Sequence, residues 1–246
     1  RLMKNSFYTG LALGFVGIIP FTFNFLVARS FGKEILGSIN ITLSFCLIIT
    51  IFITNFFGSA GNKYLAEYRG SRKLEHFQFV FKVMLGTPLI ILSIIAVILS
   101  WNWIYFSNKF SLQTDLLIPI IIYIFLRSFY ILFRRALYGI DLVKSYTVNE
   151  ILSDLIMLSA IGYVTYNKHS SLLIECYLLS YLIFCLLSTG TLLKRFKSIK
   201  ITLNRSNHFD QRDVMQKFTH YGLVSMIGTV ASTGTGYLSI IIIGMY

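Results

Sequence analysis

Long intervals with almost no charged side chains constrain the fold of this chain more than any other feature. A membrane-spanning helix needs about 20 mainly apolar residues to cross a hydrocarbon layer about 30 Å thick. Seven intervals reach that length, and they cover residues 7–28, 37–57, 83–106, 116–138, 146–166, 172–193 and 218 to the last residue. The sequence therefore predicts an all-α integral membrane protein built as a polytopic helical bundle.

The composition excludes the other broad classes of protein. Hydrophobic residues make up 55% of the chain and charged residues 13%, whereas a soluble domain is about 25% charged. A disordered chain needs low hydrophobicity and high charge, which is the opposite pattern. The net charge of +12 would indicate nucleic-acid binding in a soluble domain, but in a membrane protein basic residues mark the cytoplasmic loops. We therefore expect membrane lipids, and no nucleic acid, as partners of the basic residues.

The distribution of the 22 lysines and arginines predicts the orientation. Most of them lie in the N-terminal segment and in the second, fourth and sixth connections, while the alternate connections hold four, which are Arg29, Lys33, Lys109 and Lys168. By the positive-inside rule the N-terminus is cytoplasmic, in a multi-pass protein of the plasma (inner) membrane. The predicted outer connections at 107–115 and 167–171 are too short to fold into a catalytic domain.

The spans predict three segments. Residues 1–193 form an N-terminal six-helix transmembrane lobe, residues 194–217 a cytoplasmic linker, and residues 218–246 the first transmembrane helix of a second lobe. The linker reads either as an amphipathic element on the inner leaflet or as a solvated connector. Because the chain begins at Arg1 and ends within an apolar run, we expect it to be part of a longer protein with repeated lobes, an architecture typical of secondary transporters.

Motifs of common enzymes are absent from the sequence. It contains no phosphate-binding GxxxxGK[ST], no HExxH, no GxSxG and no CxxC motif. The three cysteines lie in apolar stretches and the four histidines are scattered, so no cofactor and no metal site are expected and the protein is not predicted to be an enzyme. The glycine-rich run at 228–236 lies within an apolar span and indicates close helix packing or a bend.

Ionisable residues within predicted spans are the candidate functional residues, because such groups are costly in a bilayer and usually face a partner or a water-filled cavity. Arg127 interrupts the fourth span, and Glu150 and Asp154 lie in the fifth. At 100° per residue, one face of the fourth helix alternates tyrosine with arginine. The members of this face predicted to bind substrate are Tyr123, Arg127, Tyr130 and Arg134.

The fourth and fifth helices are expected to form an antiparallel hairpin. Residues at equal depth in such a hairpin have a constant sum of residue numbers, which pairs Arg127 with Asp154 and Arg134 with Glu150. We therefore predict two ion pairs between the helices. One interpretation is a structural clamp in which Glu150 and Asp154 neutralise the arginines; the other is a water-filled cavity in which the arginines bind an anionic head group, since guanidinium suits phosphate. Both interpretations hold if the carboxylates release the arginines when substrate arrives.

The first span carries a candidate hinge. Pro20 removes a backbone hydrogen bond and kinks a helix, and Asn24 follows one turn later. The pair is interpreted either as a hinge or as a static kink. In the same span Gly10, Gly14 and Gly17 form a small-residue face that predicts tight helix packing.

Four short segments resemble those of a known transporter family. They are residues 28–37 (ARSFGKEILG), residues 57–69 (FGSAGNKYLAEYR), residues 135–139 (RALYG) and residues 218–223 (FTHYGL). Taken in order, they are similar to the polysaccharide-transporter branch of the multidrug/oligosaccharidyl-lipid/polysaccharide exporter superfamily, the lipid-linked oligosaccharide flippases. The resemblance covers this whole chain, which corresponds to the N-terminal half of a usual member.

The resemblance implies two six-helix lobes around a cavity that opens alternately to each side of the membrane. It implies that the cargo is a polyprenyl-pyrophosphate-linked oligosaccharide, a lipid-linked anionic glycan, moved from the inner to the outer leaflet for cell-surface polysaccharide biosynthesis. Other polysaccharide-assembly proteins are partners compatible with it. A buried cationic, aromatic groove lowers the free energy of moving a charged head group through hydrocarbon, and rocking of the lobes then gives alternating access.

Three alternatives remain open at this point. An ion-coupled multidrug antiporter of the same fold would use Glu150 and Asp154 as its proton or sodium site, but the arginines favour an anionic cargo. A membrane glycosyltransferase or polymerase needs a larger loop with catalytic residues than these connections offer. A structural subunit is compatible with the charged spans.

Overall fold

The protein is an all-helical bundle in a computed structural model that describes residues 2–110, 112–202 and 209–245. No strand occurs in these ranges. The elements are α1 Leu2–Phe31, α2 Lys33–Gly70, α3 Leu74–Trp101, α4 Trp103–Lys109, η1 Thr114–Leu116, α5 Leu117–Gly139, α6 Val143–Asn167, η2 Ser170–Leu172, α7 Leu173–Thr202, α8 Gln211–Thr229, the π-helical segment η3 Val230–Gly234 and α9 Thr235–Met245. Seven helical stretches are long and apolar enough to cross a membrane, which confirms the predicted fold class.

Several helices are longer than the apolar intervals that predict them. The α2 helix has 38 residues, which at 1.5 Å per residue is about 57 Å and far exceeds a hydrocarbon layer of about 30 Å. The third span was expected at 83–106, but α3 ends at Trp101 and the short α4 follows after Asn102. The segment expected as linker at 194–217 is largely helical, since α7 continues to Thr202 and α8 begins at Gln211.

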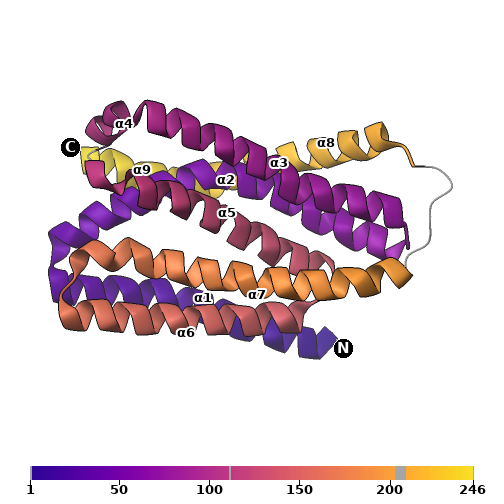
Figure 1. The fold of residues 1–246 in the computed structure, drawn as a ribbon, viewed down its shortest axis with the longest axis horizontal. Coiled ribbons are helices and arrows are strands. Elements are labelled where there is room, and N and C mark those ends of the chain that lie inside the picture. The colour runs from indigo at the N-terminus through magenta and orange to yellow at the C-terminus, as the bar shows by residue number, and fades with distance from the viewer. Residues whose placement is uncertain (1, 111, 203–208, 246) are drawn as a thin grey trace.

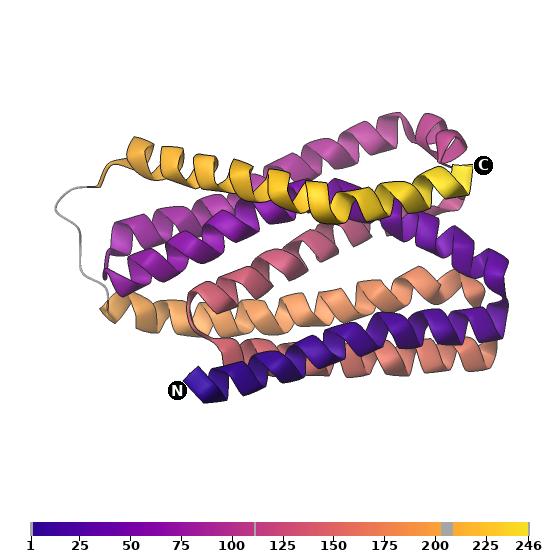
Figure 2. The same ribbon diagram turned by 180° about the vertical axis from the view of Figure 1, so that it is seen from behind.

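The chain alternates between two ends of the bundle. In Figure 1 the N-terminus, the α2–α3 and α5–α6 connections and the start of α8 lie at the right, and the α1–α2 and α6–α7 connections lie at the left with the C-terminus; Figure 2 shows the same from behind. The right-hand end carries the connections with most of the lysines and arginines. The alternation agrees with the predicted order of inner and outer connections.

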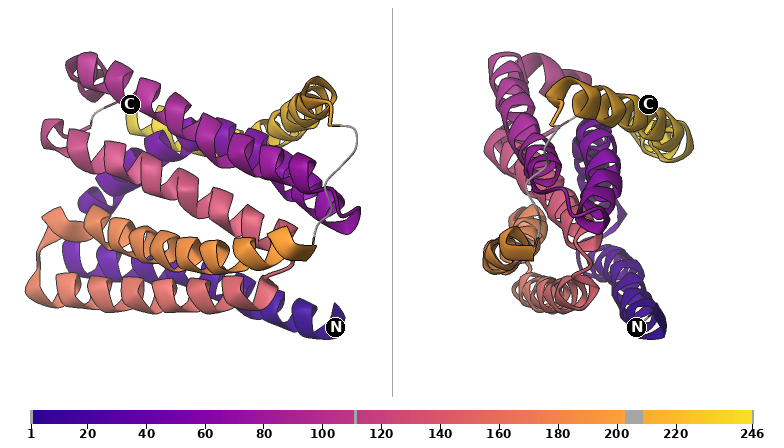
Figure 3. Two further views of the ribbon diagram at one scale, coloured as in Figure 1. Left: turned by 45° about the vertical axis from the view of Figure 1, so that its right-hand side comes forward. Right: turned by 90° about the vertical axis from the view of Figure 1, so that its right-hand side faces the viewer.

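Two groups of helices are joined by α5. One group contains α1, α6 and α7, in which α6 packs on both of the others; the second contains α3, α8 and α9 arranged on α2. Helix α5 packs on α2 with one face and on α7 with another, so it links the groups, as the two views of Figure 3 show. The residues of α5 that face α7 are therefore in the interior of the molecule.

The predicted hairpin of the fourth and fifth spans is wrong. Helices α5 and α6 make few contacts with each other, and α7 packs extensively on both of them; Figure 1 shows α7 between them. The short turn at 140–142 holds the end of α5 next to the start of α6, but the two helices need not pack on each other along their length. The α7 helix occupies that place because it carries the aromatic and small polar side chains that fit both neighbours.

The seventh apolar stretch packs on α2. Gly222 of α8 lies so close to α2 that an added Cβ would be 3.0 Å from the carbonyl oxygen of Phe56. The Tyr64 hydroxyl donates a hydrogen bond to the carbonyl oxygen of Lys217 at 3.1 Å. The glycine-rich run forms η3, a π-helical turn that passes directly into α9. These contacts attach the last described span to the rest of the bundle.

Candidate functional site

The tyrosine and arginine face of α5 packs against α7. The ring centroid of Tyr123 lies 5.6 Å from that of Tyr181, and the ring centroid of Tyr130 lies 4.8 Å from it. Arg127 lies between these two tyrosines on α5. The structure therefore brings together Tyr123, Arg127 and Tyr130, as the helical spacing predicts, and gives them a common partner on α7.

Two of the α7 residues in this cluster were not foreseen from the sequence. Tyr177 and Tyr181 stand one turn apart, with centroids 6.0 Å apart, and Tyr177 also contacts Phe23 of α1 at 4.7 Å. Their i, i+4 spacing is visible in the sequence and matches the spacing of Tyr123 and Arg127 on α5. Tyr123 and Tyr130 were predicted because they share a helix face with Arg127, whereas the face of Tyr177 and Tyr181 carries no charged residue that would mark it as a functional site.

Arg127 is held by tyrosines. Its Nη1 donates a hydrogen bond to the Tyr181 hydroxyl at 3.2 Å. Its guanidinium carbon lies 5.1 Å from the ring centroid of Tyr130 and 5.2 Å from that of Tyr181, distances at which a cation is attracted to an aromatic face. Among the described residues no carboxylate oxygen lies within 4.0 Å of Arg127. Its positive charge is thus held in place but not neutralised.

The predicted ion pairs are not formed. Arg134 stacks on Tyr146, with its guanidinium carbon 5.2 Å from the ring centroid, and within the described ranges it has no carboxylate within 4.0 Å either. The Tyr130 hydroxyl, not an arginine, donates a hydrogen bond to Glu150 Oε1. Because α7 stands between α5 and α6, the longer reach from Arg127 to Asp154 is blocked and the tyrosines take the place of the carboxylates.

Glu150 and Asp154 form a buried carboxylate pair one turn apart on α6. Glu150 is 0% exposed and Asp154 8%. Glu150 Oε2 and Asp154 Oδ2 have no hydrogen-bond partner among the described residues. The Tyr146 hydroxyl, one turn before Glu150 on the same face, is also buried and unsatisfied there. Unpaired buried carboxylates are costly, so this face of α6 has the chemistry to hold a proton or a small cation.

Small polar side chains fix α6 to α7. The Ser180 hydroxyl donates to the carbonyl oxygen of Ser153 at 3.0 Å, and Asn149 Nδ2 donates to the Ser188 hydroxyl at 3.2 Å. Hydrogen bonds between helices are one of the forces that join spans in a bilayer, where the hydrophobic effect does not drive helices together. These two bonds set the register in which the carboxylate pair of α6 faces the tyrosines.

A second face of α5 is fixed by close packing on α2. A Cβ added to Gly139 would lie 3.0 Å from the carbonyl oxygen of Asn62, and one added to Gly58 would lie 3.2 Å from Arg135 Cγ. Arg135 Nη1 donates a hydrogen bond to the Ser59 hydroxyl at 3.1 Å. The short distance between α2 and α5 therefore depends on glycine, and it positions the functional face of α5 toward α7.

The candidate hinge lies on the outside of the described bundle. Helix α1 runs through Pro20 without interruption, and Pro20 and Asn24 are both exposed. An added Cβ at Gly10, Gly14 or Gly17 meets no heavy atom of the described chain within 4 Å. The small-residue face therefore has no close-packed partner in this part of the chain, and the hinge stays a prediction.

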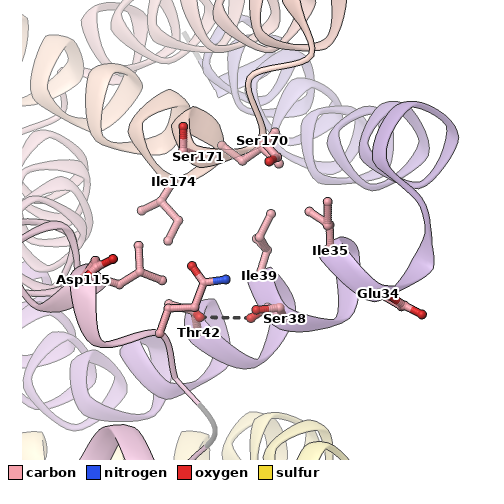
Figure 4. Close-up of a pocket in the computed structure, with 12 residues that line it drawn as sticks. Glu34, Ile35, Ser38, Ile39, Thr42, Asp115, Ser170, Ser171 and Ile174 are labelled. Atoms are coloured by element: carbon pink, nitrogen blue, oxygen red, sulfur yellow. Dashed lines mark hydrogen bonds between the residues drawn. The ribbon is translucent and has the colours of Figure 1, made fainter. Parts of the chain in front are cut away.

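A polar pocket of about 480 Å³ lies at the opposite end of the bundle from the N-terminus. Figure 4 shows side chains of α2, η1 and η2 around it, including Asp115, Ser170 and Ser171, with Ile39 and Ile174 facing the same space. Glu34 and Asp115 are its charged lining residues, and the residues lining it include no lysine or arginine. The pocket is an acidic opening at the predicted outer surface and is separate from the arginine–tyrosine cluster.

In the described parts of the chain no three His, Cys, Asp or Glu residues come together in a way that holds a metal ion. Comparisons with family models, with curated proteins and with solved structures find no match for this chain.

Proposed function

We propose that this protein is the membrane part of a flippase, a transporter that moves a polyprenyl-pyrophosphate-linked oligosaccharide from the inner to the outer leaflet of the plasma membrane by alternating access. In this proposal the N-terminus is cytoplasmic and the protein serves cell-surface polysaccharide biosynthesis. The resemblance of four sequence segments to the polysaccharide transporters suggests the cargo class, and the seven membrane-spanning helices are compatible with it.

The observation that carries the proposal is the state of Arg127. A guanidinium at the middle of a span is expensive unless it is paired, yet here it is held by Tyr130 and Tyr181 and has no carboxylate within 4.0 Å in the described chain. An uncompensated cation with a fixed orientation is suited to a phosphate group, which accepts two parallel hydrogen bonds from a guanidinium. The surrounding tyrosine rings offer flat faces for the adjoining sugar.

Arg134 extends the proposed path toward the cytoplasmic end. It lies two helical turns beyond Arg127 on α5 and stacks on Tyr146. A pyrophosphate entering from the inner leaflet would meet Arg134 first and Arg127 deeper in the membrane. Each arginine would compensate part of the negative charge of the pyrophosphate, which is costly to bury unpaired in hydrocarbon.

A second candidate, an ion-coupled multidrug antiporter of the same fold, is favoured by one observation. Glu150 and Asp154 are buried, and each has an unsatisfied oxygen with no arginine within 4.0 Å in the described ranges. Carboxylates in that state suit an exchangeable proton or sodium ion, either as the coupling ion of the flippase or as the main site of an antiporter. The two candidates differ in whether Arg127 or the carboxylates contact the cargo.

The test is transport by the full-length protein in proteoliposomes. A fluorescent polyprenyl-pyrophosphate oligosaccharide is placed in one leaflet, and its appearance in the other is measured for wild type, Arg127→Gln and Arg135→Gln. Arg135 is the matched control because it lies on the same helix but bonds to Ser59 of α2. The flippase proposal expects transport that Arg127→Gln abolishes and Arg135→Gln retains, with both variants folded.

Two results contradict the proposal, the first its function and the second its binding site. If wild type does not move the lipid-linked glycan but exports an organic cation in exchange for protons, the antiporter is the function. If Arg127→Gln transports the glycan as fast as wild type, Arg127 has only a structural role and the site assignment fails.

A further inference from the structure

The polar pocket at the predicted outer end is formed by three segments that are far apart in the sequence. They are the start of α2, the connection that contains η1, and η2 with the start of α7. Its volume of about 480 Å³ is within the range of about 300 to 1,000 Å³ that is usual for small-molecule sites. The predicted outer connections therefore border one common space of the size of a ligand site.

The pocket has an apolar floor and a polar rim. The floor contains Ile39 of α2 and Ile174 of α7, which are buried and face the same space in Figure 4. Gln113, Asp115 and Ser171 line the pocket and are exposed, so they form its rim. A sugar ring has the complementary shape, because its C–H groups lie on its faces and its hydroxyls project from its edge.

The polar groups of the rim are not used by the fold. Glu34, Gln113 and Asp115 make no side-chain hydrogen bond or ion pair with any other described residue. Deeper in the pocket, the Thr42 hydroxyl donates to the carbonyl oxygen of Ser38 at 3.0 Å and keeps lone pairs that can accept. The pocket therefore offers acceptors to a ligand that carries several O–H or N–H donors.

The charge of the lining decides which sugars fit. Glu34 and Asp115 are carboxylates, and the lining residues include no lysine, arginine or histidine. A carboxylate can accept hydrogen bonds from two neighbouring hydroxyls of a sugar, and bonds to a charged acceptor are stronger than bonds between neutral groups. A uronic acid or a phosphate would meet like charge without a compensating cation. The lining therefore favours a neutral sugar or an amino sugar.

The pocket lies next to the arginine–tyrosine cluster on its outer side. Ile174 is about one turn before Tyr177 on α7, and the ring centroid of Tyr177 lies 6.1 Å from that of Tyr123. Along α5, Leu117 and Arg127 are separated by about ten residues, or about 15 Å of helix. A glycan of several sugars attached to a pyrophosphate at Arg127 is long enough to reach the pocket.

We propose that this outer pocket binds a neutral sugar or an amino sugar and rejects acidic sugars. The ring lies on Ile39 and Ile174, and its hydroxyl or ammonium groups donate to the carboxylate of Asp115. In the transport cycle the pocket holds a sugar unit of the cargo at the outer side of the membrane. That role rests on the proposed flippase function, whereas sugar binding itself does not.

The test is binding of three disaccharides to the full-length protein in nanodiscs, measured by isothermal titration calorimetry at pH 6. Cellobiose, chitobiose (the glucosamine disaccharide) and cellobiouronic acid share one β-1,4-linked skeleton and are neutral, cationic and anionic, respectively. Wild type is expected to bind the first two at least about tenfold more tightly than cellobiouronic acid, the factor that one hydrogen bond to a charged group contributes. Asp115→Asn is expected to reduce this preference to less than about threefold, because one of the two carboxylates is then neutral.

Two further variants locate the binding. Ser38→Phe places a ring in the pocket and is expected to abolish binding of all three disaccharides. Glu67→Gln removes an exposed carboxylate near the opposite end of α2 and is expected to bind them as wild type does.

The outcomes separate this proposal from the flippase. Folded wild type that binds none of the disaccharides, or that binds cellobiouronic acid as tightly as cellobiose, overturns the sugar pocket, and so does folded Ser38→Phe with unchanged binding. The flippase proposal survives each of these results if transport of the lipid-linked glycan is observed. Conversely, wild type that binds cellobiose in this pocket but does not transport the lipid-linked glycan keeps the sugar site and loses only its role in the transport cycle.

Discussion

The two faces of α5 place an arginine side chain in two different surroundings. Toward α2, Arg135 lies over Gly58 and its guanidinium donates to the Ser59 hydroxyl at 3.1 Å. Toward α7, Arg127 stands among tyrosines and bonds to the Tyr181 hydroxyl at 3.2 Å. The two arginines are eight residues apart, about 80° around the helix, yet one face is closed by glycine packing and the other is filled by aromatic rings.

This difference separates a fixed interface from an adaptable one. A Cβ added at Gly58 or Gly139 would lie 3.0 to 3.2 Å from an atom of the facing helix, so the interface between α2 and α5 has no room for added volume. Tyrosine rings can tilt, and the Arg127 guanidinium has donors left over beyond the one bonded to Tyr181. Cargo binding is therefore expected on the α7 side, with the α2 side serving as the support. The predictions below test that division.

The largest effect is expected where the close contact is broken. Gly139→Leu places a side chain where a Cβ alone would be 3.0 Å from the Asn62 carbonyl oxygen and 3.1 Å from Leu65 Cβ. The helices must separate, which costs about 1 to 3 kcal/mol of unfolding free energy, measured by thermal or denaturant unfolding in detergent. The control is Gly162→Leu on α6, where an added Cβ meets no described atom within 4 Å and no loss is expected. Equal losses at both glycines would show that the α2 contact is not tight.

The sequence predicts the number of spans but not which helices pack closely together. Seven apolar intervals gave the seven spans, because crossing a bilayer imposes a length that composition reveals. Gly58 and Gly61 belong to a segment that resembles the transporter family, and the structure gives both glycines a packing role, since an added Cβ at Gly61 would overlap the Met84 side chain. The partner of each glycine could not be foreseen, since a glycine signals a close approach but not the helix that approaches.

The second effect concerns the buried carboxylate. Tyr130→Phe removes the only hydrogen-bond donor that the described chain gives the Glu150 carboxylate. Leaving that group unpaired is expected to cost about 1 to 2 kcal/mol, measured as the change in unfolding free energy.

The matched double variant identifies the cause of that loss. Tyr130→Phe combined with Glu150→Leu replaces both partners by apolar groups, which restores most of the lost stability because no Glu150 carboxylate is then left without its donor. If the double variant is as unstable as Tyr130→Phe alone, ring packing of Tyr130 on Tyr181 and Phe184 and not the hydrogen bond accounts for the loss.

The candidate site shows where sequence reasoning succeeded and where it failed. Arg127, Glu150 and Asp154 were singled out because ionisable groups in spans are conspicuous, and the face shared by Tyr123, Arg127 and Tyr130 followed from helical spacing. The predicted ion pairs were wrong because the prediction assumed that two helices consecutive in the chain pack on each other along their whole length. Chain order constrains only the connected ends of two helices, and the side chains of α7, which look like ordinary apolar-span residues, decided the packing.

A smaller effect is expected at Tyr181. Tyr181→Phe keeps the ring beneath the Arg127 guanidinium but removes the hydroxyl that accepts its hydrogen bond. The expected loss of stability is about 0.5 to 1 kcal/mol, and transport of the lipid-linked glycan should fall less than in Arg127→Gln because the charge remains. Tyr64→Phe, which removes a hydroxyl on α2 bonded to a backbone carbonyl, is the control from the fixed side and should leave transport unchanged. A greater transport loss in Tyr64→Phe would reverse the assignment of the two faces.

The smallest effect belongs to the bond between Asn149 of α6 and Ser188 of α7. Its donor and acceptor are 3.2 Å apart and buried, and bonds of this kind between membrane helices contribute about 0.6 kcal/mol on average. A double-mutant cycle of Asn149→Ala and Ser188→Ala, read by unfolding free energy, is expected to give a coupling of that size. A coupling near zero would mean that the register of α6 on α7 depends on the bond from Ser180 to the Ser153 carbonyl and on the packing of larger side chains. The α7 side of the molecule would then be held by that one hydrogen bond and by packing, more loosely than the glycine-packed side, as an adaptable binding face requires.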